Sequence, residues 1–523
     1  MVSVGVLSLS LAARYFQPWL SADYIYPQLF VEDVLSGKYP LSGWTLSSAP
    51  YFFPDMTVLG LLKVAGGGGT VLPAYVVFSY LGLAALMGWS LQRATQTGWT
   101  AWLAGVAFVN ALLLWQSIGD HAHYLWLFGT AGFHGGAVLL GLTNFALWAG
   151  PEDSKIDGAR WMFSFAVLVL GIMSDTLFLI QAVGPFLIGL LVQAKWNWRR
   201  PRVRSFLVTL LSALMTMVLL RLLLLWAGSF NFSKVFRYLP TPATIGRATT
   251  NFSHDLSTTL IPGAWGFFII AIVSGVIAAF WSRREKKENR VVSPNAKLAM
   301  GFAVGGLAAT TLMPLITTYW RDANHVRYIQ PWLILPAWLA LVCWLPSIKF
   351  LETNRWYLAA LGMVFVAVLG FAVPGIRTAD LQWPYPERQA RLDQFLLGRG
   401  LKHGLSGYWQ GHEINALSRT PMRVFEVKPD GSVSFWNNNA FWFYEGVDRN
   451  LTVPDYNFIV IDGLDQAALR QKFGEAAEVA QIGGYTLWLY TGSAAKQLTQ
   501  RIEVEVHDFV RGRPGAERIA LAP

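Results

Sequence analysis

Long apolar runs recur along most of this chain. Their lengths are close to the roughly 20 residues that a helix needs to cross a bilayer. They continue from the N-terminus to about Pro374, and mixed polar sequence follows. We therefore expect a membrane part, residues 1–375, and a second part, residues 376–523, that lies in water. Eleven spans are expected: 4–20, 71–91, 101–118, 125–149, 161–174, 177–194, 205–227, 263–281, 298–316, 329–345 and 356–374.

The composition agrees with a membrane protein. Charged residues make up 14% of the chain and hydrophobic residues 54%, whereas an ordinary soluble protein has about 25% charged residues. The mean hydropathy is +0.39. Cys343 is the only cysteine, so no intramolecular disulfide can form and each part must fold by packing alone.

The basic residues are distributed unevenly, and their distribution predicts an orientation. The membrane part has 25 basic and 14 acidic residues, a net +11, whereas the second part has 16 and 17, a net −1. Sixteen basic residues fall in loops on one side of the spans and seven in short loops on the other. By the positive-inside rule, the N-terminus is cytoplasmic and residues 376–523 are external, as in a multi-pass protein of a bacterial inner membrane. The net charge of +10 thus reflects insertion, and no nucleic-acid partner is expected.

A long external segment, residues 21–55, follows the first span. It begins with a run in which Tyr24 and Phe30 belong to an apolar stripe beside Asp23, Glu32 and Asp33. This pattern predicts an amphipathic helix lying on the membrane interface.

Most polar side chains suited to chemistry fall in the external loops. The sequence has no GxxxxGK[ST], HExxH, paired CxxC or GxSxG motif, which argues against the common soluble chemistries built on them. We therefore expect any chemistry at the outer membrane–water boundary. The external candidates are Asp23, Glu32, Asp33, Asp55, His121, His123, Asp175, Arg237, Arg247, Arg321, His325 and Arg327.

Asp23 follows the first span by three residues, within SADYIYP. Together with the many spans, the large first outer loop and the external C-terminal part, this resembles the GT-C superfamily of integral-membrane glycosyltransferases, which includes protein O-mannosyltransferases and aminoarabinose transferases. The resemblance implies a polyprenyl-phosphate sugar donor and an acid, here Asp23, that acts on the acceptor. Many members have an adjacent acidic pair, whereas this chain has Asp23-Tyr24, so Glu32, Asp33, Asp55 and Asp175 remain further acid candidates.

The chemistry of such a transfer can also be derived directly. A phosphate leaving group needs cationic stabilisation and the acceptor hydroxyl needs a base, so one carboxylate and one or two arginines suffice for an inverting transfer. Arg321 and Arg327 are the first candidates for the phosphate because guanidinium groups bind phosphate oxygens in pairs, and His325 lies between them. Arg237 and Arg247 are the second candidates. No cofactor is required and no metal site is predicted.

Two histidines, His121 and His123, lie in the external sequence GDHAHY. Residues two apart do not share a face of a helix, so a metal site is disfavoured. An interfacial structural role is the main alternative to a hydrogen-bonding role around the acceptor or carrier, where we also place Tyr24.

The second part predicts a small external α/β domain. Residues 392–418 suggest a helix, the sequences MRVFEV, VSFWN, FWFYE, NFIVID and YTLWLY suggest strands, and ALRQKFG suggests a helix between the last two. Aromatic residues in such strands are usually core. The loop with Trp436, Asn438 and Trp442 is nevertheless the best candidate for contacting a sugar.

Two other functions fit a chain of this composition. A transporter or flippase of a lipid-linked substrate predicts internal repeats and mid-bilayer charges, and a non-catalytic scaffold of envelope assembly predicts no convergent acid and arginines. The sequence does not identify the sugar or decide whether the acceptor is a glycan, a lipid or a protein.

Overall fold

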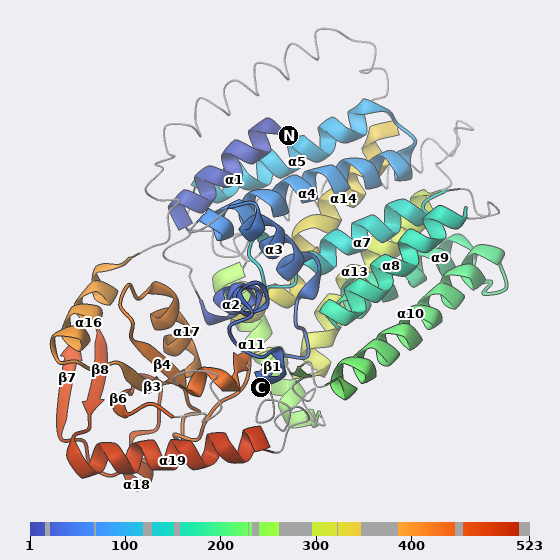
Figure 1. Ribbon diagram of the computed structural model, residues 1–523. Coiled ribbons are helices and arrows are strands. Elements are labelled where there is room, and N and C mark those ends of the chain that lie inside the picture. The colour runs from blue at the N-terminus through green and yellow to red at the C-terminus, as the bar shows by residue number, and fades with distance from the viewer. Residues whose placement is uncertain are drawn as a thin grey trace.

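The computed structural model describes residues 1–15, 21–66, 70–118, 128–150, 157–227, 230–232, 240–260, 295–318, 320–321, 323–346, 385–444 and 453–511. The helices before residue 346 form a bundle, and residues 385–511 lie together at one end of it (Figure 1). Within the bundle, the main helices and short elements are α1 (Val2–Tyr15), α2 (Ala22–Ser36), η1 (Leu41–Gly43), β1 (Trp44–Leu46), η2 (Phe52–Met56), α3 (Thr57–Val64), α4 (Val71–Thr95), α5 (Trp99–Ile118), α7 (Gly135–Trp148), α8 (Gly158–Ser174), η4 (Leu179–Val183), α9 (Gly184–Gln193), α10 (Pro201–Trp226), β2 (Asn231–Phe232), α11 (Pro242–Asp255), η5 (Leu256–Leu260), α13 (Ala296–Ile316), η6 (Ala323–Ile329) and α14 (Pro331–Trp344).

The bundle is that of a helical membrane protein. Within the described residues, four helical segments are long and apolar enough to cross a membrane: Val71–Thr95, Pro201–Trp226, Ala296–Ile316 and His325–Trp344. Five further expected spans coincide with apolar helices of 10–17 residues. The expected spans 263–281 and 356–374 lie outside the described residues.

Helix α10 shows how the bundle meets its surroundings. Its sequence is strongly apolar, yet Leu211, Met215 and Leu222 are each more than half exposed. Such a surface is costly in water but is ordinary for a helix in contact with lipid chains.

Close helix packing depends on small residues. A Cβ atom on Gly301 of α13 would lie 2.7 Å from the Cα of Gly189 in α9, and one on Gly105 of α5 would lie 2.6 Å from the backbone nitrogen of Gly88 in α4. Glycine at these four positions allows the backbones to approach, which is how helices gain packing energy in a bilayer.

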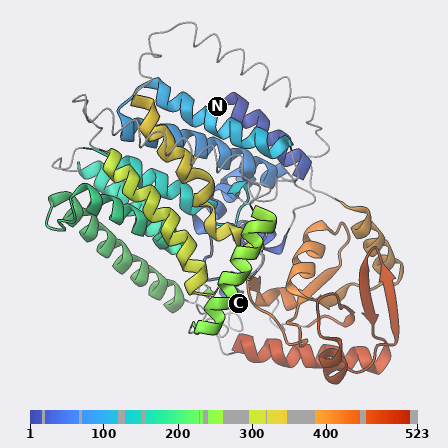
Figure 2. The same ribbon diagram turned by 180° about the vertical axis from the view of Figure 1, so that it is seen from behind.

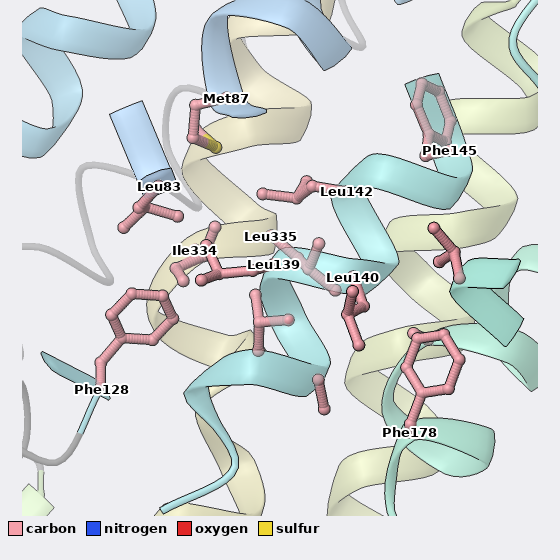
Figure 3. Packing of buried hydrophobic residues seen from close by; sticks show 14 of the residues in the cluster. Leu83, Met87, Phe128, Leu139, Leu140, Leu142, Phe145, Phe178, Ile334 and Leu335 are labelled. Carbon is pink, nitrogen blue, oxygen red and sulfur yellow. The ribbon is translucent and has the colours of Figure 1, made fainter. Parts of the chain in front are cut away.

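The centre of the bundle is filled by aliphatic side chains from α4, α7 and α14. Figure 3 shows Leu83 and Met87 of α4 facing Leu139 and Leu142 of α7, with Ile334 of α14 beside them. On the far side, α11 lies against the end of α13 (Figure 2).

Residues 385–511 contain a five-stranded sheet with the strand order β4-β3-β6-β8-β7. Strand β3 is parallel to both β4 and β6, while β8 is antiparallel to β6 and β7. The elements here are α16 (Glu387–Gly398), β3 (His403–Ser406), α17 (Tyr408–Leu417), β4 (Arg423–Glu426), β5 (Asn438–Asn439), η10 (Ala440–Phe443), β6 (Tyr456–Val460), α18 (Gln466–Phe473), β7 (Glu478–Ile482), β8 (Tyr485–Leu489) and α19 (Gly492–Arg511).

Helices cover both faces of this sheet, and successive side chains of its strands point to opposite faces. In β6, Phe458 and Val460 pack with α16 and α17, whereas Ile459 packs toward α19. Helix α19 presents buried residues at every fourth position, Leu498, Ile502, Val506 and Val510, the spacing of one apolar helix face.

Three local expectations for residues 385–511 are wrong. The sequence VSFWN is not a strand, because only Val433 forms a bridge, an isolated one to Val427, and the segment ends in a turn at Trp436 and Asn437. Residues 392–418 do not form one helix, because α16 ends at Gly398, Gly400 has a φ of +67°, and β3 precedes α17. The sequence FWFYE is not a strand. Its first residues form the 3-10 helix η10, where the Asn439 side chain accepts a hydrogen bond from the backbone nitrogen of Phe441.

The expectation that α2 lies on the membrane interface is also wrong. Side chains on all of its faces are buried, including Tyr24, Tyr26 and Asp33, while Val34 and Leu35 at its end are nearly half exposed. The cause is tertiary: α2 packs against α3 of the bundle and against α17 of the C-terminal part.

Candidate functional site

A cavity of about 270 Å³ lies where the bundle meets residues 385–511. Its wall combines the start of α2, the segment after β1, the turn before η4, the end of α13, and η6. The lining residues are Asp23, Tyr26, Ser47, Ser48, Ala49, Tyr51, Gly132, His134, Thr176, Leu177, Ile180, Met313, Thr317, Arg327, Tyr328, Trp436 and Asn437.

An ion pair lies on the cavity wall. Arg327 donates from Nη1 to Oδ2 of Asp23 at 2.9 Å, and the two side chains are 21% and 11% exposed. The Tyr408 hydroxyl donates to the other oxygen, Oδ1, also at 2.9 Å. Burial and the neighbouring Asp23 raise the pKa of Tyr408 well above its usual value, so the phenol remains protonated and donates. Both Asp23 oxygens are therefore engaged.

Local structure favours this placement. Asp23 lies in the first turn of α2, where the helix dipole stabilises a negative charge. Arg327 lies in the short helix η6 just before α14, and its guanidinium is 5.7 Å from the ring centre of Phe133 and 5.5 Å from that of Tyr328. These ring faces favour a cation in that position.

The C-terminal part reaches the cavity through one short strand. Strand β5 pairs with β1 of the first outer segment, Asn439 opposite Trp44. Just before it, Asn437 has a φ of +51° and accepts a hydrogen bond on Oδ1 from the backbone nitrogen of Ser47 at 2.8 Å. This turn places Trp436 and Asn437 in the cavity wall.

Asp33 joins the same two parts outside the cavity. Its Oδ2 accepts hydrogen bonds from the Trp44 indole at 2.9 Å, the Asn439 amide at 2.9 Å and the Trp442 indole at 3.0 Å. Burial raises the pKa of Asp33 despite these three donors. Because Oδ2 of Asp33 accepts hydrogen bonds from both parts of the chain, Asp33 has a structural role.

A second polar group, formed by Tyr51, His134 and Asp175, adjoins the same cavity. His134 Nδ1 is 2.7 Å from Asp175 Oδ2. The Tyr51 hydroxyl is 3.3 Å from His134 Nδ1 and 3.1 Å from Nε2. The Asp175 side chain also caps the following turn by accepting from the backbone nitrogen of Leu177.

Asp55 supports the cavity from behind. It accepts hydrogen bonds from the Tyr75 hydroxyl at 2.6 Å and from the backbone nitrogen of Gly132 at 2.8 Å. Burial raises its pKa to about 6. Gly132 has a φ of +81°, and a Cβ there would lie 2.5 Å from the carbonyl oxygen of Asp23, so only glycine fits between the two acids.

Several other expected site residues lie away from the cavity. Glu32 pairs with Lys63, and Arg321 and Arg247 are exposed. The His325 ring is 5.7 Å from that of Tyr328, which does line the cavity.

The expected sugar-contacting residues lie partly at the cavity and partly elsewhere. Trp436 lines the cavity. Tyr24 is fully buried and its hydroxyl donates to the carbonyl oxygen of Leu72. Asn438 is also buried and donates to the carbonyl oxygen of Ser434, and Trp442 is engaged with Asp33. The candidates Arg237, His121 and His123 lie outside the described residues.

Sequence reasoning missed two contributors, Tyr51 and Tyr408. Neither belongs to a motif, and Tyr408 reaches Asp23 across 385 positions of sequence. Asn437 belongs to the loop SFWNNNAFW, which was expected to contact a sugar. A usable signal was present for His134, because a histidine within an apolar stretch needs a polar partner.

The arrangement brings a carboxylate, a guanidinium and a histidine that is paired with a second carboxylate to one cavity. Such a site can bind an anion at Arg327 and accept a proton at Asp23 or His134. No family model, curated protein or solved structure matches this chain.

Proposed function

We propose that the protein is a membrane glycosyltransferase of the GT-C type, which transfers a sugar from a polyprenyl-phosphate carrier to an acceptor on the external side of the membrane. The observation that carries the proposal is the pairing of Asp23 with Arg327 on a cavity wall. These are the acid and the arginine that the chemistry of the transfer requires, and they come from segments 304 positions apart.

The pair suggests how the reaction begins. Arg327 binds Asp23 in the absence of substrate, and the donor phosphate, another anion with oxygen acceptors, takes the place of Asp23 on the guanidinium. This exchange frees Oδ2 of Asp23, while Tyr408 keeps Oδ1 in position. The base therefore becomes available when the donor is bound.

The transfer step then balances simply. Asp23 takes the proton of the acceptor hydroxyl as the acceptor oxygen forms a bond to the anomeric carbon. The bond from that carbon to the phosphate oxygen breaks, and its electron pair leaves with the phosphate, whose added charge Arg327 stabilises. Attack opposite the leaving group inverts the anomeric centre.

The proposal includes the finer membrane arrangement: eleven spans, a cytoplasmic N-terminus, and an external α/β domain over residues 376–523 in a bacterial inner membrane. Its support is the clustering of polar groups. Several segments that are expected outside meet at the cavity. They include residues 21–55, the turn at Asp175, and η6. At the C-terminal end of α7, Arg93 instead donates to the carbonyl oxygen of Ala146 and Arg202 donates to that of Trp148.

The test is a transfer assay in membranes containing the protein, with a panel of radiolabelled polyprenyl-phosphate sugars. We expect Asp23→Asn and Arg327→Gln each to lower transfer at least about 100-fold, since a base or a charge-stabilising group contributes on that order. The matched controls are Asp157→Asn and Arg160→Gln, the same changes in an exposed ion pair at the start of α8, which should transfer like the parent. Full activity in Asp23→Asn would remove its role as the base.

A further inference from the structure

The proposed transfer makes no use of Tyr51, His134 and Asp175. Yet His134 and Asp175 are each 5% exposed or less, and the His134 and Tyr51 side chains line the cavity. Tyr51 and His134 also have φ values of +60° and +69°. A left-handed backbone is uncommon for residues other than glycine, and such conformations are concentrated at functional sites.

Asp175 determines the tautomer of His134. An ionised carboxylate can only accept a hydrogen bond, so at 2.7 Å from Asp175 Oδ2 the Nδ1 atom carries the proton. In the neutral ring Nε2 then has a lone pair and accepts. Asp175 thus makes His134 a fixed hydrogen-bond acceptor.

Tyr51 does not fill that acceptor position. Its hydroxyl lies almost equally far from both ring nitrogens, at 3.3 and 3.1 Å. An oxygen in line with the Nε2 lone pair would be much farther from Nδ1 than from Nε2. The hydroxyl therefore lies beside the edge or face of the ring between the two nitrogens, so Tyr51 leaves the Nε2 lone pair to another donor.

We propose that His134 binds a sugar hydroxyl through Nε2, with Asp175 as its positioning residue. This inference rests on the proposed function, because it takes the sugar to be in the cavity that Asp23 and Arg327 share. A neutral ring with an open lone pair selects an O–H donor and disfavours an anion. It thus complements Arg327, which binds the phosphate. The hydroxyl belongs either to the donor sugar or to an acceptor sugar.

The room and the shape of the wall suit such a ligand. About 270 Å³ is slightly below the roughly 300–1,000 Å³ of typical small-molecule pockets and has space for one sugar ring. Trp436 in the same wall supplies an aromatic surface of the kind that packs on a sugar face.

The experiment measures binding to the purified full-length protein in lipid nanodiscs. The probes are farnesyl phosphate, which has no sugar, and farnesyl-phosphoryl derivatives of mannose, glucose, galactose and arabinose. In Asp175→Asn the amide can donate to Nδ1, so the proton moves to Nε2 and the acceptor is lost with little change in shape. We expect this variant to bind the best sugar-bearing probe about tenfold more weakly, the loss of one hydrogen bond, and farnesyl phosphate as the parent does.

Further variants separate this role from a structural one. His134→Gln keeps an oxygen acceptor and should bind the sugar-bearing probe better than His134→Leu. The control is Asp157→Asn, the same substitution at the opposite end of α8. A second set of probes, the methyl glycosides of the four sugars, identifies an acceptor sugar. If Asp175→Asn weakens binding of the farnesyl-phosphoryl sugars alone, the hydroxyl belongs to the donor sugar. If it weakens binding of the methyl glycosides alone, the hydroxyl belongs to the acceptor sugar.

Two results would overturn the inference. One is that Asp175→Asn binds every sugar probe like the parent. The other is that it loses farnesyl phosphate as strongly as the sugar-bearing probes, which is the outcome of a general disturbance of the cavity. Failure of the proposed function gives a different result: the parent binds no farnesyl phosphate, and Arg327→Gln changes nothing.

Discussion

Removing either partner of the Asp23–Arg327 pair should destabilise the protein strongly, and neutralising both should cost less than the sum of the two single changes. Arg327→Gln leaves the Asp23 carboxylate enclosed and hydrogen-bonded to Tyr408, and Asp23→Asn leaves an enclosed cation. Removal of one partner of a fully buried pair costs about 3–5 kcal/mol. The two side chains are 11% and 21% exposed, so we expect about 2–4 kcal/mol for each single variant.

The double variant Asp23→Asn/Arg327→Gln replaces the pair by two neutral amides, so its cost should be smaller than the sum by about 1–3 kcal/mol. The assay is thermal unfolding in detergent, read by a thiol-reactive fluorophore. Cys343 is the only cysteine of the chain and is partly buried, so its labelling reports loss of packing. Since 1 kcal/mol shifts the midpoint of a 150–250-residue domain by about 2–4 °C and that of a larger chain by less, we expect single variants to unfold about 3–6 °C lower.

The exposed pair Asp157–Arg160 is the control for this cycle. Its side chains are 56% and 47% exposed, and exposed pairs couple by about 0–1 kcal/mol. Equal coupling in the two cycles, or purely additive effects of Asp23→Asn and Arg327→Gln, would refute the reasoning that the cavity pair is enclosed and mutually dependent.

Three further results are expected. Asp33→Ala leaves three N–H donors, two of them on buried side chains, without their carboxylate and should cost about 3 kcal/mol, seen as a lower unfolding midpoint and faster proteolysis between the bundle and residues 385–511. Gly132→Ala puts a side chain at a φ of +81° and a Cβ 2.5 Å from the Asp23 carbonyl oxygen. It should lower the midpoint and transfer together, whereas Gly158→Ala, where a Cβ meets open space, should leave both unchanged. Burial raises the pKa of Asp55 from its ordinary 3.8 to about 6, so its contribution to stability is full below about pH 4 and is lost as the pH rises through 6; Asp55→Asn should flatten the pH dependence of the midpoint in that range.

The lengths of the apolar runs predicted helices in the membrane part well. Long apolar runs such as 71–91, 205–227 and 298–316 predict helices because a bilayer leaves the backbone no other partner than itself. The expected placement of α2 was wrong because it depends on distant contacts. Helix α2 reads as interfacial from its own residues, but α17, almost 400 positions later, buries it.

The candidate site was predictable only where local properties of the sequence indicate a residue's role. Asp23 and Arg327 were identified from charge type and position beside the membrane, which are local properties. Arg321, six positions before Arg327, was an equal candidate by sequence, and only the fold separates them, since it is Arg327 that reaches the cavity. Tyr51 and Tyr408 became part of the site through tertiary contacts, which no local pattern encodes.

The most direct test of the account is whether the purified protein in liposomes splits a polyprenyl-phosphate sugar between the anomeric carbon and the phosphate. Release of free polyprenyl phosphate is measured with a panel of sugars and a membrane extract as the source of acceptors. The account predicts release by the parent with at least one sugar, and a drop of at least about 100-fold in Asp23→Asn. If the parent releases no polyprenyl phosphate from any sugar in the panel, the transferase assignment is contradicted.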